Sequence, residues 1–251
     1  LLEAGKYFLE KQHRSAGIPK EDLLKIAIKS IGLEDLRPFK PEEKVVEYML
    51  EADKKQNKLV DLTVKGFADE TARESPAPGG GSVSAYMGAL GASLGTMVAN
   101  LSSHKPGWDD RWDEFAKWAE RGMEIQEELL HLVDEDTEAF NRIMAAFGMP
   151  KKTDEEKALR SEAIQQATLF ATEVPLETMK ASSRVFELCR QMVAEGNPNS
   201  VSDAGVGALA ARAAVLGAGM NVKINAASLK DRAKADALIA EADKLIEKAN
   251  A

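Results

Sequence analysis

Apolar residues recur every three to four positions along most of the chain, with polar and charged residues between them. This spacing places the apolar residues on one face of a helix. Runs that alternate apolar and polar residues, and Asn-Gly or Asp-Gly turns, would indicate strands and hairpins, and we find no convincing example of either. The pattern therefore predicts an all-α protein.

Glycine and proline residues interrupt the helical pattern and mark the ends of the expected elements. Residues 36–41, with two prolines, are expected to be a linker. Long helices joined by short loops indicate an antiparallel helical bundle. Pro175 lies inside one long helix and should kink or split it. The expected helices are two short ones within 1–32, broken near 17–19, then 42–50, one beginning at 62, and 82–101, 109–147, 153–195, 204–224 and 229–249.

Two of the expected helices carry a row of small side chains at helical spacing. Small side chains let two helix backbones approach closely, so each row should lie at the centre of the bundle or at the seam of a dimer. The rows are Ala85, Gly88, Ala92, Gly95 and Ala99 in one helix, and Ala204, Ala208, Ala211, Val215 and Ala218 in the other.

Composition narrows the classes of protein to consider. The 251 residues are 44% apolar and carry a net charge of −8, which allows a sizeable core and argues against nucleic acid as a partner. Cys189 is the single cysteine, so a disulfide framework within the chain is excluded. The first residues lack the basic region and cleavage site of a signal peptide. Residues 204–224 include Arg212, Asn221 and Lys223 and predict a buried core helix rather than a membrane span. We expect a soluble, cytoplasmic protein.

Asp136 occupies an unexpected position on the helix expected at 109–147. It falls within roughly 20–25° of the middle of an apolar stripe, whereas Asp134, Glu135 and Glu138 point elsewhere and should be solvated. A lone carboxylate on an apolar face is costly unless it is paired. Burial should raise its pKa, which suits a group that exchanges protons near neutral pH. The stripe consists of Leu129, Val133, Phe140, Ile143 and Phe147.

A structural role for Asp136 is the alternative. The carboxylate would then be paired with an arginine, for which Arg212 is a candidate, or with a helix N-terminus. Structural ion pairs also perturb pKa values, so the pattern alone leaves both roles open.

The segment 75–82 is rich in proline and glycine and runs directly into a helix. Its glycines allow backbone N–H groups to converge at a helix N-terminus, which favours an anion or a carboxylate. The alternative is a turn that caps the helix, with Ser82 as the N-cap. The Gly-Lys-Ser/Thr sequence of a Walker loop is missing, and the segment does not follow a strand, so a nucleotide-binding loop is not expected.

A second polar cluster ends at Ser202-Asp203, and either residue could simply cap the helix that follows. Asn221 and Asn225, one turn apart, could hydrogen-bond a heterocycle or end the helix in a turn. No two of the three histidines have the spacing of metal ligands, so we expect no metal site. The Gly-x-Ser-x-Gly sequence at 91–95 lies inside the expected helix 82–101 and follows no strand, so it does not form a nucleophile elbow.

Three segments together resemble the cyclodeaminase domain of the formiminotransferase-cyclodeaminase family. They are 68–83 (ADETARESPAPGGGSV), 132–140 (LVDEDTEAF), and Ser202-Asp203 taken with 221–225 (NVKIN). The resemblance covers residues 45–251, the expected cyclodeaminase domain. Residues 1–44 are similar to the C-terminal end of the formiminotransferase part and its linker. The active site of the transferase would lie outside this sequence, so we expect no transferase activity.

The resemblance implies an all-α homodimer, or a larger assembly, with the folate site at or near the dimer interface. It implies an ammonia-lyase of histidine degradation that converts 5-formiminotetrahydrofolate into 5,10-methenyltetrahydrofolate and ammonia, with no cofactor beyond tetrahydrofolate, with or without a polyglutamate tail. A formiminotransferase domain would belong to the full-length chain. Asp136 matches the catalytic aspartate of the family. The substrate-binding candidates are Pro78, Gly79, Gly80, Gly81, Ser82, Phe140, Ser202, Asp203, Asn221 and Asn225.

Three alternative functions remain compatible with the sequence. A methenyltetrahydrofolate cyclohydrolase would use the same pocket with water in place of the amine. A folate-binding protein would bind without turnover, and a dimerisation module would ignore folates. Phe140 could pack on a folate ring or belong to the core.

Overall fold

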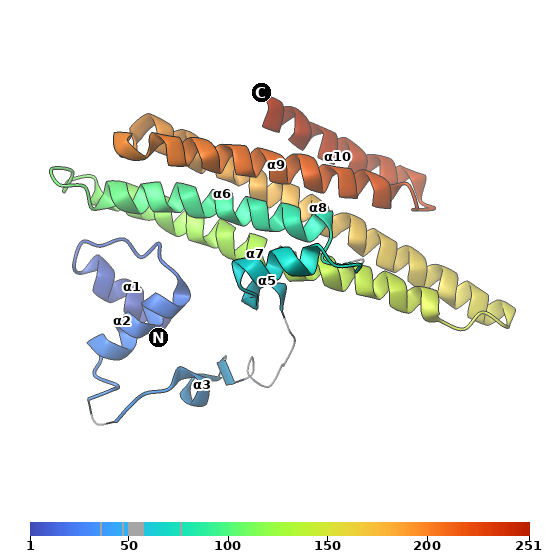
Figure 1. Cartoon of the computed structure of the whole chain (residues 1–251), viewed down its shortest axis with the longest axis horizontal. Helices are drawn as coiled ribbons and strands as arrows, with labels where there is room; N and C mark the ends of the chain where they lie inside the picture. Colours follow the sequence, from blue (N-terminus) through green and yellow to red (C-terminus); the bar gives the residue numbers. More distant parts are fainter. Residues whose placement is uncertain (36, 47, 50–57, 76) are drawn as a thin grey trace.

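The structure is a computed structural model that describes residues 1–35, 37–46, 48–49, 58–75 and 77–251. The described residues contain helices and no strand, so the all-α prediction is confirmed (Figure 1). The elements are α1 (Leu2–Glu10), α2 (Lys20–Ser30), α3 (Pro41–Lys44), η1 (Leu59–Asp61), α5 (Val64–Thr71), α6 (Gly80–Ser103), α7 (Trp112–Gly148), α8 (Asp154–Glu195), η2 (Pro198–Ser200), α9 (Val201–Ala226) and α10 (Arg232–Asn250).

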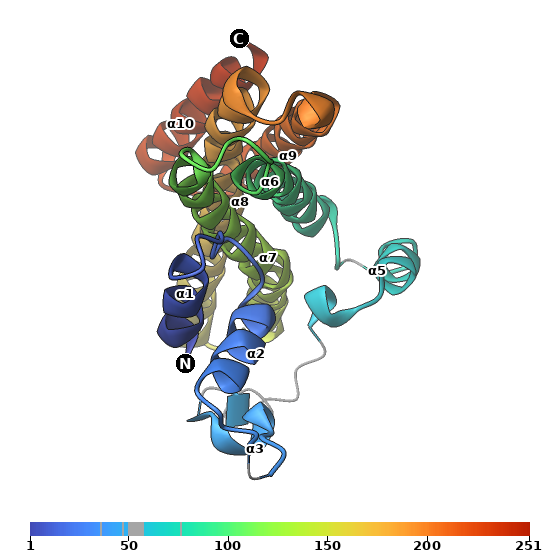
Figure 2. The ribbon, with the colours of Figure 1, turned by 90° about the vertical axis from the view of Figure 1, so that its left-hand side faces the viewer.

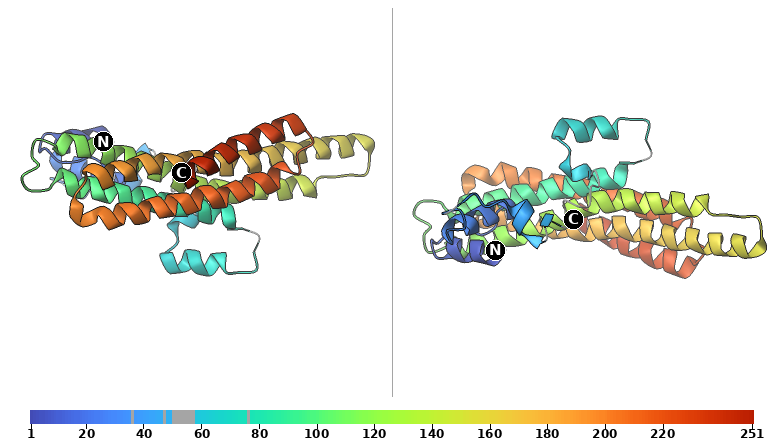
Figure 3. Two further views of the ribbon diagram at one scale, coloured as in Figure 1. Left: turned by 90° about the horizontal axis from the view of Figure 1, so that it is seen from above. Right: turned by 90° about the horizontal axis from the view of Figure 1, so that it is seen from below.

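The long helices α6, α7, α8 and α9 lie side by side, and α10 lies along α8 and α9 (Figures 1 and 2). The main hydrophobic core is enclosed by these four helices and includes Ala89, Leu129, Val185 and Ala211. In contrast, α5 stands out from the side of α6 and has no buried residue (Figure 3). The predicted helix at 42–50 lies only partly within the described residues, since residues 47 and 50 are outside them. The described part contains α3 and a few residues after it.

Small side chains bring the backbones of α6 and α9 together at the centre of the bundle. Nearly all members of the two predicted rows are buried. A Cβ built on Gly91 would lie 2.7 Å from the backbone oxygen of Gly207, and a Cβ built on Gly207 would lie 3.0 Å from the oxygen of Gly91. The helices therefore approach too closely for a side chain at Gly91.

One helix among the described residues, 198–226, is long and apolar enough to cross a membrane by composition, with a mean hydropathy of 1.3. Its small residues pack against α6 and α8, but only 39% of the apolar window is buried, so the prediction of a buried core helix holds for that face alone.

The helix α8 runs through Pro175 without interruption, so the predicted split of this helix does not occur. Proline has no N–H, and the carbonyl four residues earlier, on Ala171, loses its helical partner. The side-chain amide of Asn225 on α9 donates to this carbonyl at 2.6 Å. A neighbouring helix therefore supplies the missing hydrogen bond.

The N-terminal segment docks on α6 and α7 through the loop between α1 and α2. The side-chain amide of Asn100 donates to the Gly17 carbonyl at 2.7 Å, and the Ser15 N–H donates to Nε2 of His104 at 3.3 Å. A Cβ on Gly17 would lie 2.3 Å from the backbone of Ala119. Burial, and secondarily Arg14, lower the pKa of His104, which suits its role as an acceptor.

Gly91→Ala should destabilise the protein because the new methyl group would overlap the α9 backbone. Overpacking of this kind costs roughly 1–3 kcal/mol, equivalent to a fall in Tm of about 3–10 °C. Gly205→Ala on α9 is the matched control, since nothing lies within 4 Å of its Cβ position. Replacing a glycine inside a helix by alanine should raise Tm by about 1–4 °C. Equal Tm values for the two variants in thermal unfolding would contradict the close approach of α6 and α9.

Candidate active site

Asp136 lies on α7 opposite the first turn of α6. Its Oδ2 accepts a hydrogen bond from the Ser82 N–H at 2.8 Å and another from the Ser82 hydroxyl at 2.9 Å. The N-cap residue Gly79 offers no side-chain cap. The carboxylate, 54 residues away in sequence, therefore caps α6 at the end where the helix dipole favours negative charge.

Ser82 itself is the third residue of α6, so the alternative in which it is the N-cap is wrong. The helix begins two residues before Ser82 because Asp136 satisfies the backbone N–H at this position from outside. Ser82 is fully buried, and its hydroxyl also lies 3.4 Å from Oγ1 of Thr137.

Gly81 makes the close approach of Asp136 possible. A Cβ built on Gly81 would lie 2.0 Å from Oδ1 of Asp136, a distance that no side chain tolerates. Gly80, one residue earlier, is exposed, and its Cβ position lies 3.5 Å from Nδ2 of Asn221. Pro78 is buried just before these glycines. The glycine segment, Asp136 and Asn221 therefore meet at one place.

The pKa of Asp136 is raised above its ordinary value because burial removes water from the carboxylate. The two hydrogen bonds from Ser82 favour the charged form and oppose this effect. Asp136 is half-buried. The predicted alternative pairing with Arg212 is wrong, since the Arg212 guanidinium bonds Asn250 at 2.7 Å. The helix N-terminus is the partner that the structure provides.

Asp134, two residues before Asp136, is not solvated as the sequence predicts. Its Oδ1 accepts the Leu59 N–H at 2.6 Å, so it anchors η1 on α7. Burial raises the pKa of Asp134, although the bond from Leu59 lowers it. The helical period could not identify this role because the partner lies in a segment without a sequence signal.

Three further candidates lie on α7 and at the end of α9. Phe140 is one turn beyond Asp136 along α7 and is partly exposed. Asn221 donates to the Gly217 carbonyl of its own helix at 3.1 Å. Asn225, one turn later, donates to Ala171 of α8.

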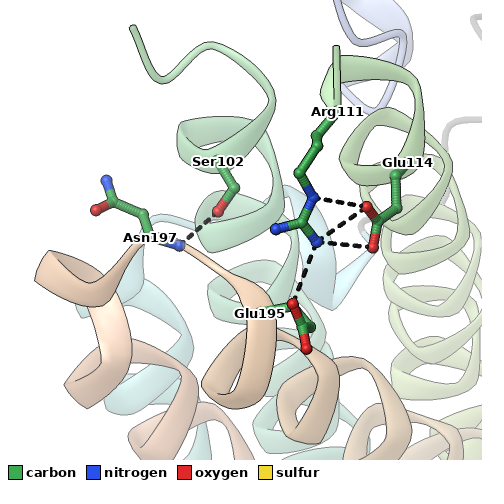
Figure 4. Close-up of polar contacts among 5 residues, drawn as sticks. All are labelled: Ser102, Arg111, Glu114, Glu195 and Asn197. Carbon is green, nitrogen blue, oxygen red and sulfur yellow. Dashed lines mark hydrogen bonds and ion pairs between the residues drawn. The ribbon is translucent and has the colours of Figure 1, made fainter. Parts of the chain in front are cut away.

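Ser202 and Asp203 lie at the other end of α9. Asn221 lies 19 positions after Ser202, which corresponds to about 28 Å along the helix. Figure 4 shows this far end, where the Asn197 N–H donates to Oγ of Ser102, the next-to-last residue of α6, at 2.8 Å. The structure therefore separates these two residues from Asp136 within one chain.

The far end is a structural junction. The guanidinium of Arg111 joins Glu114 of α7 to Glu195 of α8 (Figure 4). The alternative that Ser202 or Asp203 caps α9 is wrong, because the helix begins at Val201 and its N-cap Ser200 makes no side-chain cap bond.

The main cavities among the described residues are not lined by Asp136. The two cavities of about 420 Å³ lie elsewhere, one between the N-terminal loop and α6–α7 and the other beside Leu1 and Leu24. The part of the chain that the structure describes holds no group of three or more His, Cys, Asp or Glu side chains able to bind a metal ion.

Comparison with known proteins relates the chain to folate enzymes. The family model described as formiminotransferase-cyclodeaminase matches residues 63–244, which include Asp136 and all of the substrate-binding candidates. A second model, the formiminotransferase domain, matches residues 1–51.

Individual relatives carry two different names. Methenyltetrahydrofolate cyclohydrolase from Methylorubrum extorquens is 39% identical over 189 residues, 75% of this chain and 91% of its own. Formimidoyltransferase-cyclodeaminase from Gallus gallus is 32% identical over 231 residues, 92% of this chain but 42% of its own. The chain thus spans less than half of that animal relative.

A solved structure shares the fold. The crystal structure of formiminotetrahydrofolate cyclodeaminase from Thermotoga maritima superposes with a TM-score of 0.65 at 29% sequence identity, over 75% of this chain and 92% of the other.

Proposed function

The chain belongs to the formiminotransferase-cyclodeaminase family, and we propose that it converts 5-formiminotetrahydrofolate into 5,10-methenyltetrahydrofolate and ammonia. Residues 45–251 would be the cyclodeaminase domain, and residues 1–44 the end of a formiminotransferase part. The observation that carries the proposal is the carboxylate of Asp136, held half-buried at a helix N-terminus with a raised pKa.

Asp136 would move the proton that ring closure requires. With the formimino group protonated (–CH=NH2+), N10 attacks its carbon and forms the new N–C bond, the formimino nitrogen becomes an NH2 group, and Asp136 takes the proton from N10. It then gives this proton to the former formimino nitrogen, whose bond to carbon breaks as ammonia leaves. A carboxylate with a raised pKa can act in turn as base and as acid. Both Ser82 bonds fall on Oδ2, so Oδ1 is the oxygen that would exchange the proton.

The first turn of α6 would bind the folate. The N–H groups of Gly80 and Gly81 belong to the first helical turn, where backbone donors lack partners within the helix. They can donate to an acceptor on the pterin or to a carboxylate. Asn221 would add a side-chain amide, and Phe140 would pack on a ring. Holding N10 near the formimino carbon is an orientation task that such a rigid surface suits.

A second candidate function is methenyltetrahydrofolate cyclohydrolase. It is favoured by the relative of that name, which is 39% identical over nearly its whole length. Asp136 would then take a proton from water as the water attacks the methenyl carbon. The formiminotransferase match at residues 1–51 supports the cyclodeaminase, because it places the domain behind an enzyme part that handles formimino groups.

The cellular setting is part of the proposal. We expect a cytoplasmic ammonia-lyase of histidine degradation that accepts tetrahydrofolate with or without a polyglutamate tail, joined in the full-length protein to a formiminotransferase domain. The match of residues 1–51 to that domain supports this arrangement.

A homodimer of antiparallel bundles would bring the separated candidates together. Four residues form an apolar stripe along α9, each exposed by 53–71%: Val206, Leu209, Met220 and Ile224. A two-fold contact along this stripe is isologous. It would place the Ser202-Asp203 end of one copy beside the Asn221 end of the other, so that each folate site contains residues of both copies.

Turnover tests the proposed activity. Purified protein mixed with 5-formiminotetrahydrofolate should produce the near-ultraviolet absorbance of methenyltetrahydrofolate, and Asp136→Asn should lower kcat by about 10²–10⁴-fold. Glu138→Gln, an exposed acid that pairs with Arg142 on the same helix, should leave kcat unchanged.

Two outcomes would change the assignment. If the protein hydrolyses methenyltetrahydrofolate faster than it forms this compound from 5-formiminotetrahydrofolate, the cyclohydrolase would be established instead. No acceleration of either reaction by the wild type would contradict an enzymatic role and favour a binding or dimerisation module.

Mixed dimers test the shared site. Asp136→Asn and Asp203→Ala should each be inactive alone. When subunits of the two variants are mixed under conditions that allow exchange, half of the dimers should hold one intact site, so roughly a quarter of the wild-type activity should return.

Leu209→Glu should give inactive monomers by light scattering. Leu159→Glu, which replaces a similarly exposed leucine on α8, is the control that should remain dimeric. Full activity of monomeric Leu209→Glu would refute the shared site.

A further inference from the structure

Pro175 and Asn225 form a matched pair across α8 and α9. A proline inside a helix removes one N–H donor and leaves the carbonyl four residues earlier without a partner. In α8 this carbonyl belongs to Ala171, a buried residue. Nδ2 of Asn225 donates to it at 2.6 Å. Each member of the pair would be unfavourable without the other, because a buried carbonyl without a partner is costly.

Asn225 is partly buried, and apolar residues enclose it on the side that faces α8. Val222, three residues earlier, and Ala226, the next residue, are fully buried, and Val174 beside Pro175 is nearly so. The bond therefore joins two helices at a point where apolar packing alone would leave a polar group unsatisfied.

The same turn of α9 carries Asn221, which lies beside the first turn of α6. Its Nδ2 is 3.5 Å from the Cβ position of Gly80, and Gly81 next to Gly80 contacts Asp136. The end of α9 must therefore hold its place relative to α6 for Asn221 to remain at the site. The amide of Asn221 bonds only within its own helix, so the bond between helices comes from Asn225.

We infer that Asn225 is a positioning residue: it ties the end of α9 to the carbonyl that Pro175 leaves free, and so holds Asn221 beside Asp136. Its amide is engaged by the fold rather than aimed at a ligand. The link to substrate rests on the proposed function, whereas the link to Pro175 does not.

A thermal double-mutant cycle tests the pairing on the whole chain. Asn225→Ala should lower Tm by about 3–10 °C, since it leaves the Ala171 carbonyl unpaired. Pro175→Ala supplies the missing N–H, so adding Asn225→Ala to that variant should lower Tm by less than half as much. Asn221→Ala is the control, because its effect on Tm should be the same with either residue at 175. An equal fall in Tm for Asn225→Ala in both backgrounds would overturn the inference.

Asn225→Asp provides a second test if Pro175→Ala fails to fold. The aspartate has nearly the same shape but, when ionised, donates no hydrogen bond. It should lower Tm at neutral pH at least as much as Asn225→Ala, and a wild-type Tm would contradict the bond.

Kinetics test the positioning role. Asn225→Ala should raise KM for the formiminofolate several-fold while kcat changes less, and it should raise KM much less in the Asn221→Ala background, because its effect on the site passes through Asn221. An equal rise in KM with and without Asn221 would indicate a direct folate contact by Asn225, and an unchanged KM would show that Asn225 does not position the site; either result overturns the inference. A wild type without turnover would count against the proposed function alone, because the thermal cycle contains no folate.

Discussion

The hydrogen bonds between Ser82 and Asp136 are the interaction on which the site depends. A carboxylate from α7 caps α6, and the partial positive charge of the helix end stabilises the carboxylate in return. Glycine at position 81 leaves room for the contact. The same geometry withdraws the carboxylate from water and raises its pKa. The hydrogen bonds that cap α6 favour the charged carboxylate, whereas its burial at the same contact raises the pKa, on which the proposed proton transfer depends.

Much of the fold could be predicted from the sequence because it follows from local patterns. Helical periodicity and glycine or proline breaks locate the long helices to within a few residues. The position of Asp136 within an apolar stripe singles it out before any partner is known. Its pairing with a helix N-terminus was one of the open alternatives, and the structure selects it over Arg212.

The errors concern interactions between segments that are distant in the sequence. Ser82 has the residue type of an N-cap, but a carboxylate from another helix takes that role and α6 starts earlier. Asp134 points away from the apolar stripe, yet the η1 segment covers it. Pro175 should break a helix, but Asn225 replaces the lost bond. The separation of Ser202 and Asp203 from Asp136 follows only from the order and direction of packed helices, which periodicity does not contain.

The proposed chemistry assigns the acid–base role to Asp136 and its tuning to Ser82. The dependence of kcat/KM on pH, compared between the wild type and Ser82→Ala, tests this assignment most directly. Asp136 must be ionised in the free enzyme to act as a base, so activity should fall as the pH drops through its pKa. Removal of the Ser82 hydroxyl removes a bond to the charged form and should move this fall to higher pH. If kcat/KM falls at the same pH in the wild type and in Ser82→Ala, the assignment of this fall to Asp136 would be contradicted.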